Sequence, residues 1–308
     1  MIAAESERRI AARAAELITS GTTAILNSGT TALAVIHRRI TVSHRVAFFA
    51  DVFYNSQLSP AYWIPPGNLD VEAVLLGGDI HFSPEGLGAM LREIRKTQRD
   101  GVPIIVVAGN GEYVDRELNE SRRQYRAAVD SVPDAVFLDD DAIVLPSGLR
   151  VIGSTLWSHV PDDEIDNYSQ QLAAAGLTGV DNIRLDGHPL SVRDTNELHG
   201  QARSFLARQL SSLTTAERDE TIVCTHFWPT LRPWLDSPDN PESQWLYMTG
   251  SDMDELIAGS GPKLWLCGHA HSTHQVTIGT TRICANPRAG DGPGNINPEF
   301  QESYVVEL

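Results

Sequence analysis

Short runs of apolar residues recur along the chain from Arg45 onward, and each run ends in polar residues. Five of them are RVAFFADVF (45–53), EAVLLGGDI (72–80), VPIIVVAGN (102–110), ETIVCTHF (220–227) and KLWLCGHAH (263–271). A run without polar alternation is typical of a strand buried on both faces. Segments with a helical pattern separate the runs, around residues 84–99, 114–130, 195–213 and 251–259. The pattern therefore predicts an α/β fold in which helices cover a sheet.

Hairpin-like stretches predict further, antiparallel strands. They are AIVLPSGLRVIGSTLW (142–157), HQVTIGTTRICANPR (274–288) and the final SYVVEL (303–308). No Pro- or Ser-rich linker divides the chain, so we expect one mixed α/β sandwich over 45–308. The stretch 160–194 is polar and irregular, which indicates a long surface excursion of the kind that often forms a lid.

The first 44 residues form an extension outside this pattern. They begin with an amphipathic helical segment and continue with Ser-Gly-Thr-Thr-Ala, which occurs twice, eight residues apart. Two copies are too few for a solenoid, so we expect a pair of short strands with glycine turns. The extension could pack on a sheet edge or exchange between subunits of a homo-oligomer, and the sequence leaves both open.

Composition and charge narrow the class of protein. The 308 residues include 24 basic and 40 acidic side chains, a net charge of −16, which argues against a nucleic-acid-binding surface. The N-terminal segment has no unbroken apolar core, so we expect neither a secretory signal nor a membrane span. Three cysteines suit a reducing compartment, and the expected location is the cytoplasm.

Side chains that can bind metal stand at the polar ends of the buried runs. They are Asp51, Asp79, Asn110, His226, His269 and His271. Carboxylate, amide and imidazole groups are ligands that divalent Mn, Fe and Zn accept. The carboxyl ends of strands line the binding crevice of open α/β sheets. In an extended GHAH segment, both histidines would face one cavity. The sequence therefore predicts a site for one or two divalent ions.

The motifs, taken in order, resemble those of the calcineurin-like metallophosphoesterases. GGD (77–79), GNGE (109–112), TH (225–226) and GHAH (268–271) follow the family pattern D-x-H, G-D, G-N-H-E, a later His and G-H-x-H. The resemblance spans about residues 45–308 and includes STLW (154–157) and CANPRAG (284–290). Each motif alone is weak, whereas the ordered set is specific. The resemblance implies an α/β sandwich of two mixed sheets flanked by helices.

Site roles also follow from the resemblance. Asp79 would bridge two metals, with Asn110, His226 and His269 completing one metal site and Asp51 and His271 belonging to the other. The catalytic residues would be Asp79, His226 and His271. The implied reaction is hydrolysis of a small phosphoester or phosphodiester by metal-activated water.

Two positions depart from the family pattern. Phe53 stands where the first motif has His and cannot bind metal, and Gly111 replaces the His of G-N-H-E, which assists the leaving group. His81, two residues after Asp79, is a candidate replacement ligand. Other candidates for the missing imidazoles or proton donor are His159, His274, Tyr54 and Tyr113. Cys224 and Cys267 suit packing better than ligation.

Three functions therefore stay open. The first is a metal-dependent hydrolase that acts on a small phosphorylated molecule. The second is a repurposed mono- or dinuclear metalloenzyme with different chemistry on a small molecule. The third is a non-catalytic metal-binding protein of the same fold. The sequence does not name the substrate.

Overall fold

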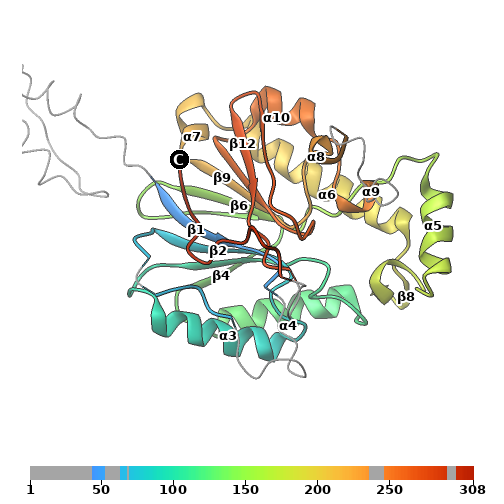
Figure 1. The fold of residues 1–308 in the computed structure, drawn as a ribbon, viewed down its shortest axis with the longest axis horizontal. Coiled ribbons are helices and arrows are strands. Elements are labelled where there is room, and N and C mark those ends of the chain that lie inside the picture. The colour runs from blue at the N-terminus through green and yellow to red at the C-terminus, as the bar shows by residue number, and fades with distance from the viewer. Residues whose placement is uncertain (1–43, 53–62, 68, 236–245, 290–295) are drawn as a thin grey trace, which may run out of the picture.

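A computed structural model describes residues 44–52, 63–67, 69–235, 246–289 and 296–308 (Figure 1). The helix and short strands expected in the extension fall on residues 1–43, outside this range, and so do Phe53 and Tyr54. Among the helices of the described chain, none has the length and apolar character needed to cross a bilayer.

The described strands form two large mixed sheets. The five-stranded sheet has the order β13 (Val305–Glu307), β1 (Arg45–Phe49), β2 (Ala73–Gly77), β3 (Ile104–Val107) and β4 (Ala135–Leu138). The six-stranded sheet has the order β11 (Gln275–Ile278), β12 (Thr281–Ala285), β10 (Leu264–Cys267), β9 (Thr221–Thr225), β6 (Arg150–Ser154) and β5 (Asp141–Val144). Within each sheet the central strands are parallel, and β13, β11 and β5 pair antiparallel.

Helices cover the outer face of each sheet, so the sandwich has four layers (Figure 1). Helices α3 (Pro84–Thr97) and α4 (Leu118–Asp130) pack on the five-stranded sheet. Helices α6 (Val192–Ser211) and α10 (Asp254–Ser260) pack on the six-stranded sheet. The remaining short helices are α7 (Thr215–Asp219), α8 (Arg232–Leu235) and α9 (Leu246–Thr249). The predicted sandwich of two mixed sheets flanked by helices is confirmed.

Alternation along each strand explains the uninterrupted apolar runs. On β2, Leu75 points into the core between the sheets, while Leu76 joins the core beneath α3 and α4. Both are fully buried, and burying such a side chain contributes about 1.5–3 kcal/mol. On β10, Leu266 lies between the sheets and Trp265 packs under α6 and α10. β2 and β10 have no polar face because neither face of these strands meets water.

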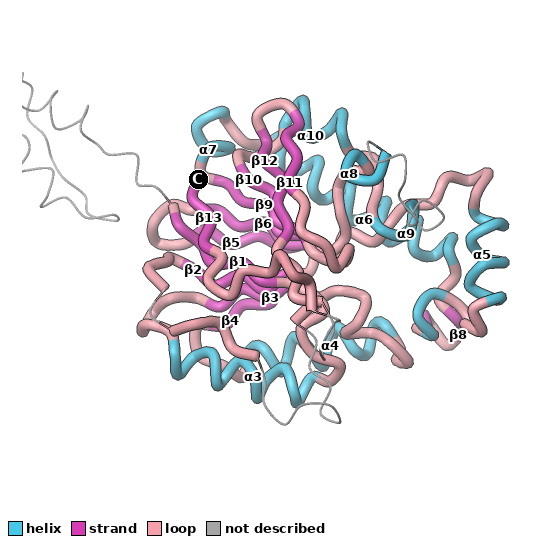
Figure 2. Tube along the Cα trace, in the orientation of Figure 1, coloured by secondary structure: helices cyan, strands magenta, loops and turns pink. Residues whose placement is uncertain are grey.

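The excursion differs from its prediction as an irregular stretch. It contains α5 (Ile165–Ala174), the 3₁₀ turn η1 (Val180–Asn182) and a two-stranded sheet of β7 (Arg184–Leu185) and β8 (His188–Pro189). Figure 2 shows α5 and β8 standing together to one side of the two sheets. Its buried Ile165, Tyr168 and Leu172, at helical spacing, were hidden among polar neighbours in the sequence.

Candidate metal centre

The candidate ligands follow the carboxyl ends of strands in both sheets. Asp51, Asp79 and Asn110 come after β1, β2 and β3 of the five-stranded sheet. His226, His269 and His271 come after β9 and β10 of the six-stranded sheet. The two sheets therefore meet at this edge, and each supplies three of the six side chains.

The backbone is left-handed at four of these six positions. Asp51, Asp79, His269 and His271 have φ values of 51°, 56°, 67° and 54°. Non-glycine residues adopt such angles rarely, at a cost of about 1–3 kcal/mol each, and those that do so often lie at functional sites. The angles also show that GHAH is not extended after β10, which is the conformation that the sequence argument for His269 and His271 assumed.

Two glycines make room for the ligands. A Cβ atom at Gly109 would lie 2.2 Å from Asp79 Oδ1. A Cβ atom at Gly78, where φ is 89°, would lie 2.5 Å from His226 Nδ1. The glycines of GGD and GNGE thus let the two carboxyl-terminal turns approach the site closely.

Three titratable side chains converge at the centre of the site. Asp79, His226 and His269 each offer one ligand atom within 4.8 Å of the others. His226 Nε2 lies 3.5 Å from Asp79 Oδ1 and 3.2 Å from His269 Nδ1. Asn110 joins them, because its Oδ1 lies 3.0 Å from His226 Nε2. We call Asp79, Asn110, His226 and His269 the inner donor group.

Backbone carbonyls fix the tautomers of both imidazoles. His226 Nδ1 lies 3.0 Å from the carbonyl oxygen of Gly77, and His269 Nε2 lies 3.2 Å from that of Met248. A carbonyl only accepts, so each of these nitrogens carries the ring proton in the neutral form. The opposite nitrogens, His226 Nε2 and His269 Nδ1, therefore present lone pairs to each other.

The orientation of the Asn110 amide is fixed in the same way. Its Nδ2 donates to Asp181 Oδ2 over 2.9 Å, so its Oδ1 faces His226. With Asp79 Oδ1, which lies 3.5 Å from His226 Nε2, the neutral tautomers direct four potential acceptor atoms toward one another. Acceptors alone repel each other, and a cation resolves this arrangement. Two imidazoles, a carboxylate and an amide oxygen fit a divalent ion of the Zn, Mn or Fe type.

Burial favours the neutral form of His269, which is the form in which an imidazole can bind a metal ion. Burial lowers the pKa of His269 well below its usual range, and the neighbouring His226 and His271 lower it further. Burial also raises the pKa of Asp79, with the carboxylates of Glu112 and Asp51 adding to the rise. A bound cation would reverse this second effect, because it favours the ionised carboxylate.

Asp51 and His271 lie beside the inner donor group and make up what we call the outer pair. Asp51 is fully buried, and its Oδ2 accepts from the His269 backbone N–H over 2.9 Å. Its Oδ1 lies 3.6 Å from His271 Nε2 and has no hydrogen bond within the described part of the chain. The side chain of His271 is 51% exposed. A buried carboxylate oxygen without a donor is consistent with a second cation here.

Glu112 holds the turns that carry the ligands. Its carboxylate accepts from the backbone N–H groups of Asp79, Ile80 and Gly109 at 2.7–2.9 Å. The N–H of Gly111 in turn donates to Asp79 Oδ1 over 2.7 Å. In these contacts Glu112 supports the turns that carry the candidate ligands.

The candidate replacements for the missing imidazoles lie elsewhere. His81 Nδ1 accepts from the Ser83 N–H over 3.0 Å, and its ring lies against Gly86 at the start of α3. His81 thus lies outside the converging group. His274 contacts the rings of Trp228 and Trp234, and exposed His159 lies against His199.

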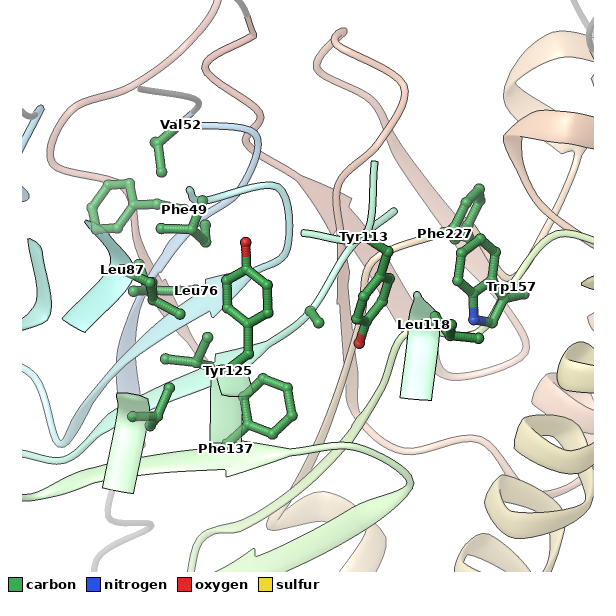
Figure 3. Packing of buried hydrophobic residues seen from close by; sticks show 14 of the residues in the cluster. Phe49, Val52, Leu76, Leu87, Tyr113, Leu118, Tyr125, Phe137, Trp157 and Phe227 are labelled. Atoms are coloured by element: carbon green, nitrogen blue, oxygen red, sulfur yellow. The ribbon is translucent and has the colours of Figure 1, made fainter. Parts of the chain in front are cut away.

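Aromatic residues form the wall behind the site. Tyr113 is fully buried and stacks on Trp157, with ring centroids 6.1 Å apart. Phe227 lies between Trp157, at 5.7 Å, and His269, at 4.1 Å. Figure 3 shows Tyr113, Trp157 and Phe227 side by side in the apolar packing. Tyr113 therefore packs, and burial raises its pKa far above its usual range.

Cys224 and Cys267 also pack. Both are fully buried, and burial raises the pKa of each thiol. They lie in the apolar cores on the two faces of the six-stranded sheet.

Two groups that orient candidate ligands were not predicted from the sequence. The carbonyl of Met248 fixes His269, and a backbone group leaves no trace in residue type. Asp181 orients Asn110 from 71 residues away, and in the sequence it is one of many acidic residues in the excursion.

Comparison with known proteins bears on the fold. No protein-family model matches the chain, and no curated protein matches it in sequence. A solved structure of phosphopantetheinyl hydrolase from Mycobacterium tuberculosis is similar, with a TM-score of 0.54 and 14% identity over 80% of this chain and 90% of that one. This chain has the calcineurin-like metallophosphoesterase fold. The TT1561 protein of Thermus thermophilus shows a weaker similarity, with a TM-score of 0.43 and 12% identity over 80% of this chain and 90% of that one.

The metallophosphoesterase fold agrees with the resemblance drawn from the motifs. At this level of identity the similarity shows the fold alone, and one fold can carry many functions.

Proposed function

We propose that this chain is a metal-dependent hydrolase that acts on a small phosphoester or phosphodiester. The observation that carries the proposal is the inner donor group, in which Asp79, Asn110, His226 and His269 bring one potential ligand atom each to the same place. The metallophosphoesterase fold supports the reaction class.

The residues that would hold the cation follow from the geometry. Asp79, Asn110, His226 and His269 would hold one divalent ion, and Asp51 and His271, with Asp79, would hold a second. When bound, such ions polarise a phosphoryl oxygen and make water more acidic at neutral pH. The chain itself keeps both imidazoles neutral and correctly oriented through the carbonyls of Gly77 and Met248.

Among the described residues, neither position 111 nor position 113 offers the leaving group a proton. Gly111 has no side chain to protonate it, and Tyr113 faces the apolar core. General acid catalysis typically contributes about 10²–10⁴-fold. We therefore expect activated esters, whose leaving group departs without a proton, to be far better substrates than alkyl phosphates.

A second candidate is different chemistry on a small molecule at the same metal centre. Gly111, which stands where the family pattern has a histidine, favours this second candidate. That histidine assists the departure of a phosphate leaving group, and here it is missing. Binding of metal without turnover of any phosphate ester would shift the assignment to this candidate or to a non-catalytic metal-binding protein.

The test combines metal content with turnover. Protein stripped with a chelator is reconstituted with Zn²⁺, Mn²⁺ or Fe²⁺, and bound metal is measured by atomic emission. Bis(p-nitrophenyl) phosphate, p-nitrophenyl phosphate and an alkyl phosphate are assayed, with Asp79→Ala as the inactive control. Metal binding with the order diester or aryl ester above alkyl ester is expected. A wild-type protein that takes up no metal would refute the proposal.

A further inference from the structure

Asp181 makes a contact that sets it apart from the other acidic residues of the excursion. Its Oδ2 accepts from Asn110 Nδ2 over 2.9 Å, at a half-buried position. Asp181 lies in η1 with a left-handed φ of 52°. A carboxylate held in an unfavourable backbone conformation and aimed at a candidate metal ligand calls for a function.

The position of Asp181 does not depend on Asn110. Its own carbonyl accepts from the Asp115 N–H over 3.4 Å, and the Arg184 N–H donates to the Arg116 carbonyl over 2.8 Å. These bonds fix η1 and β7 onto the segment that follows the GNGE turn.

The tip of the excursion is held by a second contact. The carboxylate of Glu117 accepts from the N–H groups of Asp186 and Gly187 over 2.9 Å and 3.2 Å, in the turn between β7 and β8. The Asp181 carboxylate is therefore held in position by bonds other than the one from Asn110.

The direction of the Asn110 amide matters for a cation. An amide presents an acceptor on one side and a donor on the other, and rotation by half a turn exchanges them. An NH₂ group turned toward His226 would place hydrogens where a cation must bind. Because a carboxylate only accepts, Asp181 admits Nδ2 alone and thereby directs Oδ1 inward.

We propose that Asp181 is a positioning residue, which sets the metal affinity of the inner donor group by fixing the Asn110 amide. The inference rests on the metal site of the proposed function. It also assigns the excursion a fixed role as part of the site's support, in place of the mobile lid suggested by the sequence.

Asp186 offers a matched control. It belongs to the same excursion and accepts the same kind of bond, from Asn119 Nδ2 over 3.2 Å, but Asn119 lies on α4 and is no ligand. Asp181→Ala and Asp186→Ala each remove one carboxylate and one asparagine contact. Only the first contact leads to the inner donor group.

The experiment measures the dissociation constant of Zn²⁺ by competition with a chromophoric chelator, together with the melting temperature of each metal-free protein. Removing such an outer hydrogen-bond partner typically costs about 10–100-fold in metal affinity. We expect Asp181→Ala to weaken Zn²⁺ binding to this extent while Asp186→Ala binds as the wild type does. Asp181→Asn, whose amide can offer Asn110 either an oxygen or an NH₂ group, should restore the affinity only in part.

The outcomes separate the two proposals. If wild-type protein binds no Zn²⁺, the proposed function fails. If wild type binds Zn²⁺ but Asp181→Ala and Asp186→Ala do so equally well, the positioning role is refuted and the proposed function stands. Asp181→Leu, which branches at Cγ as Asp does and has no acceptor, replaces Asp181→Ala should that variant not fold.

Discussion

The inner donor group and the outer pair lie side by side but differ in completeness. The inner group brings two buried imidazoles, a carboxylate and an amide oxygen together, and each side chain is oriented by a second contact. The outer pair offers one buried carboxylate and one imidazole whose side chain is half exposed. The position at which the family pattern has a further His is Phe53.

This difference indicates two metal affinities in one cleft. A cation in the inner group would exchange water for four fixed ligands, whereas one beside the outer pair would keep more of its water. We therefore expect the first equivalent of metal to bind much more tightly than the second. Substitutions at the two positions test this difference in metal affinity.

Loss of an inner imidazole should have the largest effect. His226→Ala removes the side chain that contacts Asp79, Asn110 and His269, so metal content should fall to background. The loss of affinity should exceed the about 10–100-fold expected for an outer hydrogen-bond partner. Atomic emission after dialysis measures it.

His188→Ala provides the control, since His188 is an exposed residue on β8. Unchanged metal content in His226→Ala would contradict the site, provided the variant remains folded by circular dichroism.

Restoring an imidazole at the GNGE turn should raise turnover of poor leaving groups. Gly111 is not among the described residues with positive φ, so a histidine there requires no left-handed backbone. Its N–H would still donate to Asp79. We expect Gly111→His to increase hydrolysis of alkyl phosphates by about 10²-fold, the lower end of general acid catalysis.

Activated aryl esters supply the internal control for this variant, because their leaving group needs no proton. Metal-loaded Gly111→His with no gain on alkyl esters would speak against phosphoester hydrolysis as the reaction.

A buried histidine outside the site provides a reference for pH dependence. His199 Nδ1 lies 2.8 Å from the Trp157 carbonyl, and burial lowers its pKa from 6.5 to about 4. Below pH 6.5 the unfolded chain binds a proton that the folded chain refuses, so stability falls as pH drops toward 4. His199→Gln should remove up to about 3 kcal/mol of this loss.

Urea unfolding at pH 7 and pH 4.5 measures the difference between wild type and His199→Gln. Added metal should leave this difference unchanged, since His199 lies outside the inner donor group. If the difference changes with added metal, His199 is coupled to the site and is no longer an independent reference.

The smallest effect is expected at the outer pair. His271→Ala should abolish binding of the second equivalent while weakening the first by about tenfold at most, because the inner ligands and their supporting contacts remain. Isothermal titration with Zn²⁺ resolves the two events. Equal loss of both equivalents would show that the two positions form one site.

The sequence predicted the fold, and the strand-end positions of the candidate ligands, for a physical reason. Strands such as β2 and β9 are buried on both faces, so their apolar runs are unbroken and their polar ends stand out. The end of each run is also the end of the strand, which is where α/β sheets place their sites. Asp79 and His226 could therefore be found without coordinates.

What the sequence missed depends on contacts that residue types do not reveal. The left-handed angle at Asp79 removed the extended backbone from which His81 was placed as a candidate ligand. The carbonyl of Met248 acts through the backbone, and Asp181 acts through a distant excursion. Such contributions come from tertiary structure and have no local pattern.

One consequence follows from the origin of the ligands in both sheets. An ion bound at this edge joins β2 and β3 on one side to β9 and β10 on the other, so separating the sheets requires releasing it. Binding to the folded state alone adds about 4 kcal/mol at a thousandfold excess over the dissociation constant. Protein purified in a chelating buffer would accordingly melt early, and its thermal shift on adding different cations would rank them before any substrate is known.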